Sequence, residues 1–355
     1  MHDEVPLVEQ LATTGLRLGE YRVVRNDGIF CIPLKQLFSP TPGKAPNSAP
    51  SNPRQGKQPT MPILQISGSR VEYLELGSGE PVVLLHSSGS SGAQWRALAE
   101  RLGERYRVIA PDLYGFGGTA HWPGRRPFHL ECEAEIVLAL LGRIDRRAHL
   151  VGHSYGGAVA LHAAGLRRDL LRSLTLIEPV AFHLLRETDA SALAEITQVA
   201  ESVARATVRG EYLAGFERFV DYWNGPDAWA EVPADKRQAM AARLPTIALD
   251  FHATLNEPTR LEDFCWMTVP TLLLCGTTSP LPTRRICDLL ERILPEARLE
   301  TIGGAGHMAP VTHRDQVNAM IIAQIDSNSR QASRCPAVAE TLSGTNAESA
   351  ARTAA

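Results

Sequence analysis

The sequence has little of what usually marks a protein that binds nucleic acid, metal or membrane. Its 36 Lys and Arg residues stand against 39 Asp and Glu residues, a formal net charge of −3, so there is no basic excess for nucleic acid or an anionic membrane surface. No apolar run approaches the ~18 residues that a membrane-spanning helix needs. The six cysteines include no C-x-x-C pair and the histidines do not cluster. We therefore expect neither a metal site nor a disulfide framework.

Signals for export and for cofactors are also lacking. The chain begins Met1-His2-Asp3-Glu4-Val5, without the basic segment and apolar core of a secretory signal, so we expect a cytoplasmic protein with reduced cysteines. The glycine-rich loops lack the lysine of a phosphate-binding loop and do not fit the dinucleotide pattern, so no cofactor is expected. What remains is a chain of 355 residues, 44% of them hydrophobic, which is enough for one α/β core with an inserted subdomain.

A serine between a strand-like run and a helix-like segment is the most informative feature that is present. The apolar run 148–151 leads into G-H-S-Y-G at 152–156, and helical periodicity continues to about residue 166. Glycines two before and two after Ser154 let strand and helix approach closely, and they leave the hydroxyl exposed above the sheet. The helix also points free N–H groups toward negative charge beside the serine. The pattern predicts a nucleophile elbow at Ser154.

A loop rich in serine and glycine follows an earlier buried strand. The continuous apolar run 81–86 is typical of a parallel strand, and it gives way to S-S-G-S-S-G at 87–92 before a helix that begins near 93–95. We expect the backbone N–H of Ser88 to form an oxyanion hole with the N–H of Tyr155, the residue after the nucleophile.

A histidine on a glycine-rich loop comes late in the chain. The segment G-G-A-G-H-M at 303–308 follows a strand-like stretch at 298–302 and precedes a helix from about Asp315. Such a histidine can lie over the sheet edge, take the Ser154 proton during attack and return it to the leaving group. We expect His307 to be this base. The side chain of His153 should point away from the site and have a structural role.

Taken together, these motifs resemble the α/β-hydrolase family over about residues 62–326. The loop after His86, the segment D-L-Y-G-F-G at 112–117, the Ser154 elbow and the loop that carries His307 occur in the family's order. The resemblance implies a Ser-acid-His triad at the carboxyl ends of parallel strands. It also makes Asp112 a loop-bracing residue.

The family's usual acid is missing. After the run 271–275 and Gly276, the family places an aspartate about three residues on, where this chain has Ser279. The best replacement is Glu178, directly after the strand-like run 174–177. Adjacent strands lie roughly 4.8 Å apart, so a glutamate at the end of this strand can reach the same histidine. Some α/β-hydrolases, including a group of haloalkane dehalogenases, take their acid from this strand. The alternative is a solvated glutamate at a strand end.

Strand-like and helical segments alternate through the body of the chain. After an antiparallel edge hairpin at 63–76, strands are expected near 82–86, 107–110, 148–152, 173–178, 270–275 and 298–302. This alternation predicts the α/β class, with a doubly wound, mainly parallel sheet that binds ligands at the carboxyl ends of its strands.

The domain boundaries follow from breaks in this alternation and from composition. The core is expected at 62–180 and 264–326. Residues 1–61 form an extension with a short hairpin around 26–28 and a disordered linker, and residues 327–355 form a disordered tail.

Residues 181–263 show helical periodicity over 190–208, 212–223 and 234–244, and we expect them to form a helical lid over the serine. Aromatic side chains of this segment could line an acyl or aromatic pocket: Phe182, Phe216, Phe219, Tyr222, Trp223, Trp229 and Phe251. Tyr222 and Trp223 are the leading candidates for the substrate pocket, because the turn N-G-P that follows them suits a pocket rim.

These observations predict a serine hydrolase of the esterase type that acts on a small molecule through an acyl-enzyme. The scissile bond is an ester, thioester, lactone or activated carbon-carbon bond. Ser154 attacks, His307 moves the proton and Glu178 orients His307. Serine at the elbow disfavours haloalkane dehalogenase and epoxide hydrolase chemistry, which use aspartate there.

Three alternatives stay open at this point. They are acyl transfer to an acceptor other than water, a non-catalytic binding protein marked by the loss of the acid at 279, and a cofactor-free lyase or perhydrolase. The sequence determines neither the identity of the substrate nor the oligomeric state.

Overall fold

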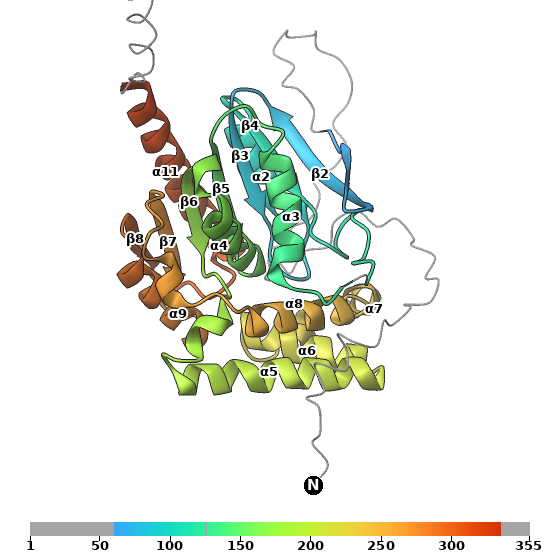
Figure 1. Cartoon of the computed structure of the whole chain (residues 1–355). Helices are drawn as coiled ribbons and strands as arrows, with labels where there is room; N and C mark the ends of the chain where they lie inside the picture. Colours follow the sequence, from blue (N-terminus) through green and yellow to red (C-terminus); the bar gives the residue numbers. More distant parts are fainter. Residues whose placement is uncertain (1–59, 125, 335–355) are drawn as a thin grey trace, which may run out of the picture.

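Eight strands form one sheet with the order β1-β2-β4-β3-β5-β6-β7-β8 in the computed structural model, which describes residues 60–124 and 126–334 (Figure 1). The strands are β1 (Ile63–Ile66), β2 (Ser69–Gly77), β3 (Glu80–Leu85), β4 (Tyr106–Pro111), β5 (Ala148–His153), β6 (Leu171–Ile177), β7 (Thr271–Gly276) and β8 (Ala297–Ile302). The hairpin expected around 26–28, the linker before residue 60 and the end of the tail lie outside the described residues.

The sheet is antiparallel at one edge and parallel elsewhere. β2 pairs antiparallel with both β1 and β4, whereas every pairing from β4 through β3, β5, β6 and β7 to β8 is parallel. The doubly wound, mainly parallel sheet predicted from the alternating segments is therefore confirmed. Its carboxyl ends bring together loops that are far apart in the sequence.

Helices cover both faces of the sheet because the central strands are apolar on both sides. In β3, Val83 and Leu85 belong to one buried cluster, and Val82 and Leu84 belong to the other. The first cluster packs against α3 (Leu130–Leu141), α4 (Tyr155–Arg167) and α9 (Leu281–Ile293), and the second against α2 (Arg96–Leu102) and α11 (Arg314–Arg334).

A helical insert, residues 182–264, separates β6 from β7. It contains the short helices η4 (Phe182–Leu185), η5 (Ala228–Glu231) and η6 (Leu261–Phe264), and the longer α5 (Ala190–Arg209), α6 (Tyr212–Asn224), α7 (Ala234–Ala241) and α8 (Leu244–Asn256). Figure 1 shows α5 to α8 stacked against one end of the sheet, with α8 nearest to it.

Two helices end elsewhere than the sequence pattern indicates. The helix expected over 234–244 ends at Ala241, and α8 starts at Leu244 with Pro245 in its first turn, where a missing N–H costs nothing. The tail expected from residue 327 is helical to Arg334, because α11 continues through it. Buried Asn328 donates to the carbonyl oxygen of Gln324, which ties this turn to the preceding one.

None of the helices in 60–124 and 126–334 is both long and apolar enough to cross a membrane.

Candidate active site

Ser154 lies on a strained turn between β5 and α4. Its backbone has φ 56° and ψ −118°, a conformation that a non-glycine residue rarely adopts. A Cβ on Gly152 would overlap the carbonyl oxygen of Gly156, and a Cβ on Gly156 would lie 2.5 Å from that of His86. The two flanking glycines are therefore required by the close approach of strand and helix. The turn leaves Ser154 on the wall of a cavity.

His307 lies between Ser154 and Glu178. Its Nε2 is 2.8 Å from the Ser154 Oγ and its Nδ1 is 2.7 Å from the Glu178 Oε2. With Glu178 ionised, Nδ1–H donates to the carboxylate and the Nε2 lone pair accepts from the hydroxyl. A histidine in this tautomer can remove the serine proton and hold the resulting charge next to a carboxylate.

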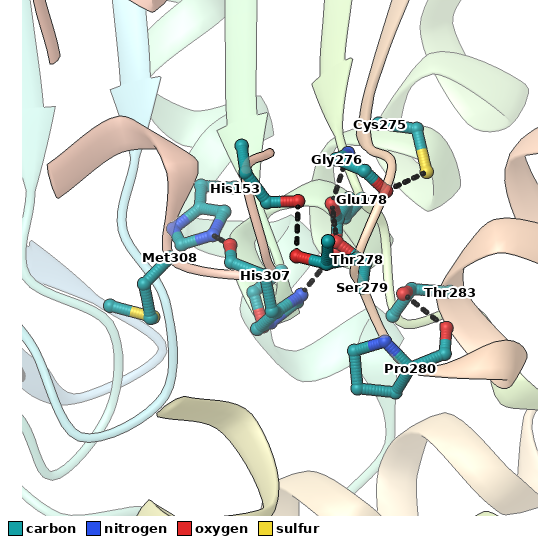
Figure 2. A network of polar contacts seen from close by, with 12 residues as sticks. His153, Glu178, Cys275, Gly276, Thr278, Ser279, Pro280, Thr283, His307 and Met308 are labelled. Carbon is teal, nitrogen blue, oxygen red and sulfur yellow. Dashed lines mark hydrogen bonds and ion pairs between the residues drawn. The ribbon is translucent and has the colours of Figure 1, made fainter. Parts of the chain in front are cut away.

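Glu178 directly follows β6 with φ 43°, and its carboxylate is held from two sides. Its Oε1 accepts hydrogen bonds from the Gly276 N–H at 2.7 Å and from the Ser279 Oγ at 2.5 Å, while its Oε2 faces His307 (Figure 2). Burial favours the neutral acid, but the bond and charge of His307, with the bonds from Ser279 and Gly276, hold the pKa of Glu178 below its ordinary value. Ser279, in the loop after β7, thus stabilises the carboxylate of Glu178 at the end of the neighbouring strand β6.

His153 connects the loop of His307 to the loop after β3. Its Nε2 is 3.0 Å from the carbonyl oxygen of His307, and its Nδ1 is 3.1 Å from the Gln94 Nε2. The Gln94 Oε1 in turn accepts from both the N–H and the hydroxyl of Ser87. Burial lowers the pKa of His153 to about 3, so the ring is neutral and can donate at Nε2 while it accepts at Nδ1. The side chain is absent from the cavity lining, and its bond to the backbone of His307 can fix the position of that residue.

The loop that carries Ser88 is braced at both ends. The His86 Nε2 accepts from the Leu113 N–H, so its Nδ1 carries the proton and donates to the Ser87 carbonyl oxygen at 2.8 Å. Asp112 accepts from the N–H groups of Gly92 and Gly118 at 2.7 and 2.8 Å. Asp112 thus has the bracing contacts expected of it. Ser88 and Tyr155, whose N–H groups are the expected oxyanion donors, both line the cavity beside Ser154.

The cavity is small and mostly apolar. Its volume is about 30 Å³, room for one or two water molecules. The lining residues are Ser87, Ser88, Ser154, Tyr155, Val180, Phe182, Phe219, Trp223, Asn224, Asp250, Phe251, Thr254, His307 and Met308. The Trp223 ring covers His307, with the ring centroids 4.1 Å apart.

Tyr222 is placed differently from the expectation. It is absent from the cavity lining, and its hydroxyl donates to the Glu195 carboxylate on α5 at 2.8 Å. Consecutive residues of a helix point about 100° apart, so Trp223 faces the cavity while Tyr222 turns toward α5. Of the other aromatic candidates, Phe182, Phe219 and Phe251 line the cavity, whereas Phe216 and Trp229 pack against each other.

Two buried acids near the site were not anticipated. Asp250 of α8 lines the cavity and accepts from the Ser88 Oγ, and Glu133 of α3 accepts from the Tyr114 N–H. Burial raises the pKa of each carboxyl well above its ordinary value. The signal for Asp250 was a single acid in the apolar stretch 247–255. Within the described residues, no three His, Cys, Asp or Glu side chains gather as metal ligands would.

Comparison with known proteins identifies the family. The profile of the alpha/beta hydrolase family matches residues 82–320, about two thirds of the chain. The chain belongs to the α/β-hydrolase family. This agrees with the sheet order and with the motif order, and it makes the protein a hydrolase.

Relatives of this α/β-hydrolase have several activities. The chain is 28% identical over 255 residues to the pimeloyl-[acyl-carrier protein] methyl ester esterase of Aeromonas hydrophila. The matched segment covers 69% of this chain and 95% of the esterase. The chain is 36% identical over 123 residues to a 2-hydroxy-6-oxo-6-(2'-aminophenyl)hexa-2,4-dienoic acid hydrolase of Metapseudomonas resinovorans, 32% of this chain and 41% of that enzyme. The solved structure of the epoxide hydrolase CorEH has the same fold, with a TM-score of 0.63 at 21% identity over 76% of this chain and 99% of that one.

Proposed function

We propose that this α/β-hydrolase cleaves an ester, thioester, lactone or activated carbon-carbon bond of a small organic substrate through a covalent acyl-enzyme. Ser154 is the nucleophile, His307 the general base and acid, and Glu178 the acid that orients His307. The N–H groups of Ser88 and Tyr155 bind the oxyanion. The insert that carries Trp223 acts as a lid.

One observation carries this proposal. A continuous chain of hydrogen bonds runs from the Ser154 Oγ through both ring nitrogens of His307 to the Glu178 carboxylate, with links of 2.8 and 2.7 Å. All three side chains are buried, with exposed fractions of 6%, 2% and 0%. Such a chain activates a hydroxyl that is otherwise a poor nucleophile.

The reaction follows from these contacts for a carbonyl substrate. The Ser154 Oγ bonds to the carbonyl carbon as its proton passes to the His307 Nε2, and the carbonyl electron pair moves to the oxygen held by the two N–H groups. Collapse of this intermediate breaks the bond to the leaving group, which takes the proton from Nε2. Water then attacks the acyl-enzyme, gives a proton to Nε2, and releases a carboxylic acid as the proton returns to Ser154.

A fluorophosphonate probe tests the proposal directly. We expect the intact protein to gain the mass of one phosphonyl group, and the Ser154→Ala variant to gain none. Failure of the folded wild-type protein to form an adduct would contradict an activated serine and favour a non-catalytic role. An adduct that persists in Ser154→Ala would place the reactive group elsewhere.

A further inference from the structure

Two polar side chains near the site, Gln94 and His153, are absent from the cavity lining and have no step in the proposed reaction. The Gln94 Oε1 accepts from the Ser87 N–H at 3.1 Å and from the Ser87 hydroxyl at 3.0 Å. The Gln94 Nε2 lies 3.1 Å from the His153 Nδ1, and the His153 Nε2 lies 3.0 Å from the His307 carbonyl oxygen. These contacts form one continuous chain of hydrogen bonds from the loop that carries Ser88 to the loop that carries His307.

Only one arrangement of hydrogens satisfies every contact of this chain. A backbone N–H can only donate, so the Gln94 atom that faces Ser87 is the amide oxygen, and the atom that faces His153 is the NH₂ group. The His153 Nδ1 must therefore accept, and the single ring proton lies on Nε2, where it meets a carbonyl oxygen that can only accept. Turning either side chain over would set donor against donor beside a histidine with an exposed fraction of 0%.

The ends of the chain hold the two groups that must act together on a carbonyl substrate. The Ser87 carbonyl oxygen, which accepts from the His86 Nδ1 at 2.8 Å, belongs to the same planar peptide group as the Ser88 N–H. The contacts of Ser87 therefore set the direction of the expected oxyanion donor. At the other end, the bond to the His307 carbonyl oxygen fixes the backbone of the residue whose ring faces Ser154.

We propose that Gln94 and His153 are positioning residues that hold the Ser88 N–H and the His307 ring in one fixed geometry around Ser154. The inference rests on the proposed function and adds two residues to it. Attack on a carbonyl needs the base and the oxyanion donor in place at the same moment, so a rigid connection between their loops favours the transition state. The neutral state that the partners impose on His153 also matters. Its ring centroid lies 5.2 Å from that of His307, where a second positive charge would oppose the imidazolium.

Saturation kinetics of fluorophosphonate labelling test this role without knowledge of the natural substrate. Gln94→Leu and His153→Phe each break the chain while filling a similar volume. We expect the maximal rate constant of labelling to fall about 10- to 100-fold in each variant. The half-saturating probe concentration should stay within about threefold of wild type, because neither side chain lines the cavity. His153→Gln, which keeps an N–H donor near the position of Nε2, should label at least about threefold faster than His153→Phe.

The double variant Gln94→Leu/His153→Phe tests whether the two residues act as one unit. Because either change breaks the same chain, its maximal rate constant should lie within about threefold of that of the slower single variant. Losses that multiply in the double variant would show two independent effects and would contradict the proposal. Wild-type labelling rates in either single variant would contradict it as well. Gln94 is only partly buried, so Gln94→Leu provides this test by itself where His153→Phe does not fold.

His149→Phe is the matched control for loss of a buried histidine. His149 also lies on β5 with an exposed fraction of 0%, and its two ring nitrogens contact the hydroxyls of Ser173 and Ser329 near the amino end of the strand. This variant should lower Tm as His153→Phe does, yet label within about threefold of the wild-type rate. A loss equal to that of His153→Phe would reduce the role of His153 to general stability. A wild-type protein that does not label at all would overturn the proposed function, and the positioning role with it.

Discussion

At the scale of single residues, the acid of the proposed triad is the most unusual feature. Ser279 stands where the resemblance calls for an aspartate, and its hydroxyl donates to the carboxylate of Glu178, which lies against His307. The carboxyl group therefore comes from the end of β6 instead of the loop after β7, while the histidine keeps a carboxylate partner. Loss of the aspartate does not imply loss of activity, because the histidine requires the charge and the acceptor rather than a particular strand.

The position of the carboxyl group predicts that an aspartate at residue 279 can restore activity to a Glu178 variant. Glu178→Gln should reduce kcat by about 10³ to 10⁴, since a neutral partner cannot stabilise the charged imidazole. Adding Ser279→Asp to that variant should recover at least about 10-fold, because the new carboxylate would enter from the usual strand. Steady-state kinetics of the single and double variants would check this. A Glu178→Gln variant within about 10-fold of wild type would remove Glu178 from the triad.

The ionisation of Glu178 also predicts a pH dependence of stability. Its pKa is lowered in the folded protein, so its ionised form stabilises the fold above the ordinary glutamate pKa of about 4.3, and this contribution is lost as the pH falls through the folded value. The Tm difference between wild type and Glu178→Gln should thus be constant from pH 7 to about 5 and shrink below about pH 4. Calorimetry or circular dichroism would measure it. A difference that grows on acidification would contradict this assignment.

At the scale of elements, the β5-α4 turn shows how close packing holds a serine in a rare backbone conformation. The turn holds Ser154 at φ 56°, and the helix can approach β3 only because Gly156 has no side chain. Strain at the serine is maintained by the contacts on either side of it.

Gly156→Ala tests this packing. Its Cβ would lie 2.5 Å from the carbonyl oxygen of His86, so we expect a loss of about 1–3 kcal/mol of unfolding free energy and a large loss of fluorophosphonate labelling. Gly165→Ala is the matched control in the same helix. Its Cβ would lie 3.4 Å from a ring atom of Phe264, and it should stabilise by up to about 1 kcal/mol. Denaturant unfolding of both variants gives the comparison, and equal stabilities would argue against a tight turn.

At the scale of the whole molecule, the insert and the sheet build the site jointly. The sheet contributes Ser154, Glu178 and His307, while the insert contributes Trp223, Asp250 and the aromatic walls. Arg243, next to α8, also donates to the Gly89 carbonyl oxygen of the loop that carries Ser88. The insert therefore contacts both the loop that carries Ser88 and His307, so under the proposed function its position would affect the reaction as well as the selection of substrate.

Trp223→Ala tests the covering role of the insert. Removing the ring that stacks on His307 should enlarge the cavity and raise the relative kcat/KM for long acyl esters over short ones by about 10-fold or more. Tyr222→Phe, which removes only a hydroxyl bonded to Glu195, should leave the chain-length profile unchanged. Rates for p-nitrophenyl esters of graded length would show this, and identical profiles for both variants and wild type would contradict it.

Local patterns in the sequence were enough to predict the mainly parallel sheet, the elbow at Ser154 and the family. Strand alternation, flanking glycines and motif order can be read from short segments of sequence. The local structure that such segments indicate does not depend on knowing which distant residues they contact. Glu178 was a candidate acid from its strand-end position, but its contact with His307 joins residues 129 positions apart and depends on the order of strands in the sheet.

Only the tertiary structure decided which side chains of the insert face the cavity. Helical periodicity located α6 and α8, but not their rotation about their own axes, so Trp223 faces the cavity and Tyr222 does not. The tertiary structure likewise brought Asp250 into contact with Ser88, which is 162 positions away in the sequence. The extension of α11 to Arg334 depended on packing in the same way, because serine- and asparagine-rich segments form helix where their side chains find partners on the core. Such contacts are set by the assembled surface rather than by the residues of one segment.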